Sequence, residues 1–324
     1  MTIQTKRKWI LLLAVLLLAA ALSVGSTSLW KAEKEKRGEG YVAVVRIDGA
    51  IYGGPETDSM LSGSSGSSSE EIMRELQEAR KDPQAKAILI RINSPGGSTG
   101  ATQEIAEEMD KIRSSKKPIV ISMGDMCASA GYWLASKGNY IFASPATMTG
   151  SIGVYMDYTN IEDLMDKVGV KNDKIKSGAH KDILSMYRPM TGEEREMLQT
   201  MVDDIYHQFV QTVADGRHMD EEKVKSIADG RILTGRQAQD LGLVDAMGNY
   251  YDALNYAASS GGLDVDHIET RSYTNSAVTL RSLLRGEAVR LSNVMGESMA
   301  ESMKKALTEG ETPVVKCDRE TSEV

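Results

Sequence analysis

Strand-like apolar runs alternate with helix-like runs through this chain, and this alternation limits the possible folds more than any other feature. In the helix-like run after residue 98, Ile105, Met109 and Ile112 recur at helical spacing. Strands that alternate with helices form parallel sheets, so we expect an α/β fold built from repeated strand–helix units. The runs that read as strands are 41–51, 85–92, 118–122 and 140–144.

A serine among small residues stands where the strand at 118–122 gives way to a helix-like run ending near Lys137. Ser129 lies between Ala128 and Ala130, followed by Gly131. A hydroxyl beside helix N-terminal amides suits a nucleophile with an oxyanion site. The same small residues would also let a helix pack closely on a sheet. The residues alone leave both interpretations open.

The turn at 93–98, Asn-Ser-Pro-Gly-Gly-Ser, ends the preceding strand. Carboxyl ends of parallel strands meet at one edge of a sheet, so this turn and Ser129 are expected to face one site. Gly96 and Gly97 either supply backbone angles that other residues avoid or aim an amide at an oxyanion.

A second serine has a weaker motif. Ser151 lies in Thr149-Gly150-Ser151-Ile152-Gly153, which misses G-x-S-x-G because Thr149 replaces the first glycine. Its flanks read as strand and strand, whereas that motif needs strand, turn and helix. A turn entering a strand is the favoured interpretation.

Two residues are candidates for the base that activates Ser129. Of the four histidines, His180 is the one in a predicted loop and would serve a Ser-His-Asp triad. Lys181 would serve a Ser-Lys dyad, provided that burial lowers its pKa enough to keep it neutral. No spacing typical of zinc ligands occurs, so we expect no metal and no cofactor.

The N-terminal segment predicts a membrane anchor. Residues 1–8 carry a basic cluster, and no charge occurs between Lys8 and Lys31. We expect a short cytoplasmic segment at 1–8 and a transmembrane helix at 9–30, with Trp9 and Trp30 at the interfaces. The protein would then be a single-pass protein of the cell membrane, with the rest of the chain, including the catalytic domain, extracytoplasmic. A signal peptide cleaved near Gly25 is the alternative.

The remaining boundaries follow from composition. A charged linker at 31–40 precedes a catalytic domain at 41–262, then a helical extension at 263–308 and a flexible tail at 309–324. The net charge of −8 argues against a nucleic-acid partner. Two cysteines provide no disulfide framework.

From about Tyr41 to Ala258 the chain resembles bacterial signal peptide peptidase A, in its short form with one protease module. The resemblance rests on four motifs in the family's order, which are 91–98, 128–133, 149–154 and 175–182. It implies a serine protease of the Clp-protease/crotonase-like fold. Remnant signal peptides and other unfolded peptides would be its substrates, and the short form would assemble as a homo-oligomer with its sites at subunit interfaces.

The resemblance also implies roles for individual residues. Ser129 would be the nucleophile and Lys181 the general base, contributed by adjacent chains. The amides of Gly97 and Ala130 would hold the oxyanion, although the family usually has glycine at the position of Ala130. Ser177 is a further candidate, as a residue that orients the lysine.

Two other functions remain open at this point. A membrane-tethered scaffold would bind peptides without cleaving them. A crotonase-like enzyme would act on acyl-CoA, but an extracytoplasmic placement argues against that substrate. Loss of turnover on removal of the Ser129 hydroxyl would distinguish the protease from the scaffold.

Overall fold

A central sheet organises the computed structural model, which describes residues 40–55 and 66–273. Within these residues eight strands join one sheet. Its main path runs β10-β1-β4-β5-β6-β9, and β7 pairs in parallel with β5 and antiparallel with β8. All neighbours along the main path are parallel, so the expected α/β fold with a central parallel sheet is confirmed. The strands are β1 (Tyr41–Asp48), β4 (Ala85–Ser94), β5 (Ile119–Ala128), β6 (Tyr140–Ala143), β7 (Met148–Gly150), β8 (Ile232–Thr234), β9 (Ala246–Met247) and β10 (Thr270–Arg271).

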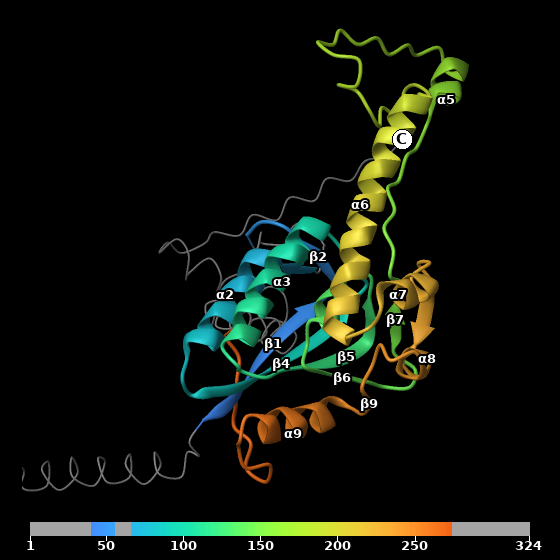
Figure 1. Cartoon of the computed structure of the whole chain (residues 1–324). Coiled ribbons are helices and arrows are strands. Elements are labelled where there is room, and N and C mark those ends of the chain that lie inside the picture. The colour runs from blue at the N-terminus through green and yellow to red at the C-terminus, as the bar shows by residue number, and fades with distance from the viewer. Residues whose placement is uncertain (1–39, 56–65, 274–324) are drawn as a thin grey trace, which may run out of the picture. The chain divides into compact units, whose positions relative to one another are not determined.

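Two short strands, β2 (Ala50–Tyr52) and β3 (Gly66–Ser68), form a separate parallel pair. Helices cover both faces of the main sheet (Figure 1). Helix α9 packs on β1, β4, β5 and β6, and the contacts of α2, α3, α4 and α6 build the opposite layer. The helices are α2 (Ser69–Lys81), α3 (Thr99–Ser114), α4 (Ala130–Ser136), α5 (Glu162–Lys167), α6 (Gly192–Arg217), α7 (Glu221–Ile227), α8 (Gly235–Asp240) and α9 (Tyr250–Ser260).

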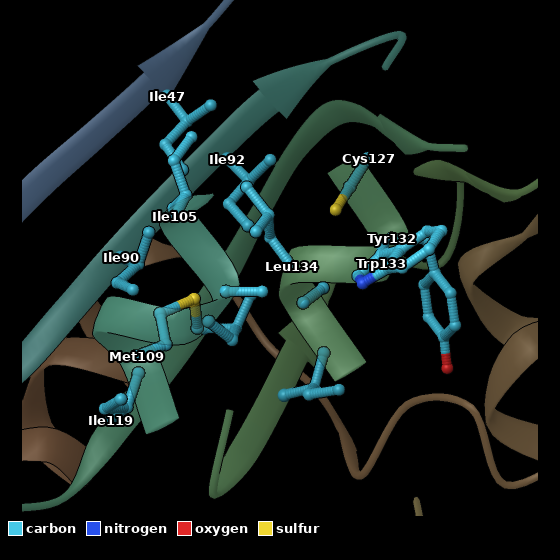
Figure 2. Packing of buried hydrophobic residues seen from close by; sticks show 14 of the residues in the cluster. Ile47, Ile90, Ile92, Ile105, Met109, Ile119, Cys127, Tyr132, Trp133 and Leu134 are labelled. Carbon is cyan, nitrogen blue, oxygen red and sulfur yellow. The ribbon is translucent and has the colours of Figure 1, made fainter. Parts of the chain in front are cut away.

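The inner strands are apolar at nearly every position because both faces of the sheet are covered. On β4, Ile88, Ile90 and Ile92 belong to the larger core, and Ala87 and Leu89 face the α9 layer. Side chains of a strand alternate between its two faces, so a strand buried on both sides needs continuous apolar residues. Figure 2 shows isoleucines of β4 and Met109 of α3 in the larger core.

Strand β5 runs to Ala128, beyond the expected end at residue 122. Its pairing with β4 shifts register between Ile92 and Ser94. The side chain of Asn93 occupies the gap, where its Oδ1 accepts a hydrogen bond of 3.1 Å from the Met126 amide. A bulge of this kind re-aims the strand that follows it. The last residues of β5 pair with β7 and lead directly into α4.

The long helix α6 begins with a capping box between Thr191 and Glu194. Toward its C-terminal end Phe209 stacks on Trp133 of α4, with ring centroids 4.8 Å apart. Gly216 lets the two helices approach, because a Cβ there would lie 2.1 Å from the Ser136 carbonyl oxygen. A second capping box, between Thr234 and Gln237, begins α8.

The fold continues past the predicted domain boundary at residue 262. Residues 270–271 form β10, which pairs with β1 at Val42 and Ala43, where a helical extension was expected. Side chains also connect this segment to β1, since the hydroxyls of Tyr41 and Tyr273 lie 2.7 Å apart. The chain from 263 to 273 therefore belongs with the sheet.

Several predicted segments lie outside the described residues. These are the cytoplasmic segment 1–8, the transmembrane helix 9–30, nearly all of the linker 31–40, the extension from 274 to 308 and the tail 309–324. Across 40–55 and 66–273, none of the helices combines the length and the apolar character that a bilayer span requires.

Candidate active site

Ser129 occupies the junction between β5 and α4 in a backbone conformation that non-glycine residues rarely adopt. Its φ is 53° and its ψ is −124°. Hydrogen bonds on both sides hold this conformation, because its amide donates to the Gly150 carbonyl at 2.9 Å and its carbonyl accepts from the Trp133 amide at 2.9 Å. Such conformations cost of order 1–3 kcal/mol and concentrate at functional sites. The side chain is only partly buried.

The glycine turn predicted to face Ser129 lies directly against it. A Cβ on Gly96 would come within 2.9 Å of the Ser129 Cβ and 3.1 Å of the Ala130 amide nitrogen. Gly96 has a φ of 113°, a value that side chains disfavour. Glycine is therefore required here both by the backbone angle and by the space that Ser129 occupies.

Strand β2 holds the turn in place. The Ile51 amide donates to the Gly96 carbonyl at 2.9 Å, and the Ser98 amide donates to the Ile51 carbonyl at 2.8 Å. Because these two groups of the turn face Ile51, the Gly97 amide between them faces the opposite way. A Cβ on Gly97 would lie 2.0 Å from the Ile51 carbonyl oxygen, which leaves glycine as the residue that fits.

Two amides near Ser129 are free to bind a ligand. Within the described residues, neither Gly97 nor Ala130 donates its amide hydrogen to another protein group. Ala130 is the first residue of α4, where an amide has no acceptor in its own helix. The fold thus places one unused amide directly after Ser129, at Ala130, and a second at Gly97, next to the Gly96 that lies against Ser129.

Ser151 lies next to Ser129 in the folded chain. It follows Gly150, whose carbonyl accepts the Ser129 amide, and its own amide donates to the Arg231 carbonyl at 2.8 Å. Its φ of 49° is again positive. The sequence pattern indicated a turn at Ser151, and the register of β5 with β7 adds that this turn lies beside Ser129.

Cys127 is close in sequence to Ser129 but faces the core. Its thiol is fully buried, and burial raises its pKa well above the ordinary value. The thiol contacts the Gly131 carbonyl at 3.4 Å. It therefore stays protonated and serves as a small apolar residue of the core.

Lys181 lies in an exposed turn of the segment between α5 and α6. Ser177 and His180 belong to the same turn, and the described contacts include no hydrogen bond between Ser177 and Lys181. His180 faces acidic residues, with its Nε2 3.7 Å from Glu193 and its Nδ1 3.9 Å from Glu194.

The length of α6 separates this turn from Ser129 of the same chain. The turn is tied to Glu194 in the first turn of α6, whereas Phe209 marks where α6 meets α4. At 1.5 Å per residue these two points are about 22 Å apart along the helix. Figure 1 shows α5 near the N-terminal end of α6 and α7 near its other end. Within one chain the structure does not bring Lys181, Ser177 or His180 to Ser129.

No group of three or more His, Cys, Asp or Glu side chains suited to a metal ion occurs in the part of the chain that the structure describes. The chemistry that this geometry supports in one chain is that of a strained hydroxyl beside two free amides.

Comparison with known proteins identifies the family of this chain. The family model for peptidase family S49 matches residues 111–264, which include Ser129 and Lys181. A Synechocystis protein with a provisional protease name is 44% identical over 218 residues, covering 67% of this chain and 78% of that protein.

Two further relatives carry protease names. Protease 4 of Salmonella typhi is 38% identical over 230 residues, which are 71% of this chain and 36% of that protein. The chloroplastic serine protease SPPA of Arabidopsis thaliana is 31% identical over 251 residues, which are 76% of this chain and 35% of that protein. These relatives support a protease function and confirm the resemblance to signal peptide peptidase A. The chain belongs to peptidase family S49.

Proposed function

We propose that this protein is a membrane-anchored serine endopeptidase that uses Ser129 as nucleophile and Lys181 as general base. The observation that carries the proposal is the conformation of Ser129 at the end of β5, against the Gly96–Gly97 turn. A hydroxyl held this way, with two unused amides beside it, suits acyl transfer.

The reaction takes place in two steps. Neutral Lys181 accepts the Ser129 proton while the serine oxygen attacks a peptide carbonyl, and the amides of Gly97 and Ala130 donate to the oxygen that becomes negative. The peptide C–N bond breaks, the amine leaves with the proton from Lys181, and an acyl-enzyme ester remains. Water, deprotonated by Lys181, then hydrolyses the ester and frees Ser129.

A neighbouring copy of the chain supplies the lysine in this proposal. The separation along α6 supports an intermolecular dyad, because Lys181 cannot accept a proton over roughly 20 Å. Apolar side chains exposed around the same segment support an interface there, with Tyr155 83% exposed and Ile175 fully exposed. The protein would act as a homo-oligomer with its sites between subunits.

Substrates and location follow from the sequence and the family resemblance. The predicted helix at 9–30 would place the catalytic domain at the outer face of the cell membrane. Remnant signal peptides and other unfolded peptides, bound in extended form on a Clp-protease/crotonase-like fold, are the proposed substrates.

The sharpest test is complementation between two inactive variants of the full chain. Ser129→Ala lacks the nucleophile and Lys181→Ala lacks the base, so each alone should fail to hydrolyse a fluorogenic peptide. If the dyad forms between chains, unfolding and refolding the two variants together restores turnover well above the sum of the separate preparations. Mixing each variant with itself provides the control.

The other outcomes separate the alternatives. An active Lys181→Ala with an inactive His180→Ala would replace the dyad by a triad. Two inactive variants that never complement would place both groups in one chain. A wild-type protein that binds unfolded peptides but cleaves none would favour the scaffold.

A further inference from the structure

The residue after Lys181 accepts hydrogen bonds from two cations, and a third, Lys174, lies 3.9 Å away. The Asp182 carboxylate accepts hydrogen bonds from Arg188, with Nε 2.9 Å from Oδ2 and Nη2 2.8 Å from Oδ1. Lys176 adds a bond of 2.6 Å from its Nζ to Oδ1. Two parallel bonds between a guanidinium and a carboxylate fix the direction of both groups. One end of the lysine-bearing turn therefore has a defined orientation.

Arg188 also binds the first turn of α6. Its Nη1 and Nη2 donate to the Glu194 carboxylate at 2.8 and 2.6 Å. The Glu194 side chain is 2% exposed and accepts a further bond of 3.0 Å from the Thr191 amide in the capping box. One guanidinium thus joins the residue next to Lys181 to a carboxylate built into the helix.

Arginine is suited to this double role because its planar guanidinium carries five donors in a fixed geometry. Lysine has one ammonium and cannot bind both carboxylates in the same way. The hydrogen bonds from Arg188 lower the pKa of both Asp182 and Glu194, so both carboxylates remain charged at neutral pH.

The backbone contributes less to the placement of Lys181. Its amide donates to the Gly178 carbonyl at 3.3 Å within the turn, and its side chain is exposed. Contacts of this kind shape the turn but do not orient it against α6. The side-chain hydrogen bonds of Arg188 provide that orientation, because His180 approaches Glu194 at 3.9 Å without a hydrogen bond.

We propose that Arg188 is a positioning residue, which sets the location of Lys181 by joining Asp182 to Glu194. This inference rests on the proposed function, in which Lys181 reaches Ser129 of a neighbouring chain. An error in the orientation of the turn would then displace the base from the nucleophile. Displacements of about 1 Å cost on the order of 100-fold in rate.

The test compares steady-state hydrolysis by the assembled full-length protein and its variants. In Arg188→Gln we expect kcat to fall by about 10- to 100-fold with KM unchanged, because Lys181 touches the reacting atoms but does not bind the peptide. Arg188→Lys keeps one ion pair and should recover part of the loss. Arg74→Gln is the matched control, since it removes a guanidinium 3.1 Å from Glu71 on α2 and should keep wild-type kcat.

A second variant separates positioning from support of α6. Asp182→Asn leaves the bonds between Arg188 and Glu194 intact but weakens the link to Lys181. If Arg188 positions the base, this variant also loses kcat, with its helical content and subunit number unchanged. Wild-type kcat in Asp182→Asn would show that Arg188 merely supports the helix, and it would overturn the inference.

Lys181→Ala distinguishes this inference from the proposed function. An inactive Lys181→Ala together with wild-type kcat in Arg188→Gln would overturn the positioning role and leave the dyad intact. An active Lys181→Ala would refute the dyad and the positioning role together.

Discussion

The contact between Gly96 and Ser129 makes Gly96→Ala the most informative single substitution. The new Cβ would stand 2.9 Å from the Ser129 Cβ, whereas carbon atoms in favourable contact are about 3.5–4.0 Å apart. At least about 0.6 Å of movement must be shared between the turn and Ser129. The alanine also takes a φ of 113°, which costs of order 1–3 kcal/mol.

Two effects on measured quantities follow. The free energy of unfolding should fall by about 1–3 kcal/mol from the backbone angle alone. The value of kcat/KM for peptide hydrolysis should fall by about 10- to 100-fold, because Ser129 moves relative to the amides of Gly97 and Ala130. Urea unfolding measures the first effect, and a fluorogenic peptide assay on the folded protein measures the second.

Gly54→Ala is the control for the backbone cost. Gly54 has a φ of 96°, but no described atom lies within 4 Å of an added Cβ. This variant should lose a similar amount of stability and keep its activity. If Gly96→Ala keeps wild-type kcat/KM, Ser129 does not depend on the turn and the site as described is refuted.

Three further predictions concern the core beside the site. Gly216→Ala should lose about 1–3 kcal/mol of unfolding free energy, because overpacking against the α4 carbonyl outweighs a gain of about 1 kcal/mol in helix propensity. The control is Gly100→Ala on α3, where an added Cβ meets no neighbour, and this variant should lose no stability. Equal free energies of unfolding for the two variants in urea would contradict the prediction. Burial raises the pKa of Tyr132, so its contribution to stability is present below about pH 10 and is lost as the pH rises above that value. Tyr132→Phe should cost about 1–3 kcal/mol at pH 8, since its hydroxyl donates to the Leu243 carbonyl at 2.9 Å, and it should weaken the alkaline loss seen by circular dichroism. Cys127 should resist iodoacetamide in the folded protein and react in urea, as read by peptide mass mapping; rapid modification of the native protein would disprove its burial.

The alternating pattern of strands and helices was enough to predict the central sheet. Runs such as Ile88 to Ile92 are apolar without interruption, which is typical of strands covered on both faces. The starts of α6 and α8 are marked by local signals, because the capping boxes at Thr191 and Thr234 depend on hydrogen bonds within four residues.

Features that depend on distant contacts were harder to predict. The pattern of β5 breaks at Gly124 and Asp125, which resemble a loop, yet Asn93 fills the bulge and the strand continues. Strand β10 has two residues and gains its place from pairing with β1. Neither feature leaves a periodic signal in its own segment.

The helical stripe of α6 shows a further limit. Met197, Met201, Ile205 and Phe209 recur every four residues, a spacing typical of one buried face. In the structure Phe209 is buried, but Met197 and Met201 are 45% and 53% exposed. Periodicity identifies the apolar face of a helix without saying where its packing partner ends.

The same limit applies to the site. The chemistry of Ser129 and its glycine turn is local to two strand ends, so sequence motifs placed them together. The distance to Lys181 depends on how far α6 extends beyond α4, and no motif encodes that. The sequence also gave no indication of the link from Arg188 to Asp182 and Glu194. Those residues meet only because of the shape of the turn between them, and no motif predicts that shape.

If the dyad forms between chains as proposed, the length of α6 also determines how the activity is controlled. In that case a single folded chain would carry the nucleophile without its base, and it would not hydrolyse peptides by itself. Activity would then require assembly, and at low protein concentration it should increase more steeply than in proportion to the amount of protein. Dilution would then lower the activity of each chain without any inhibitor, so the local concentration of the protein would itself regulate hydrolysis.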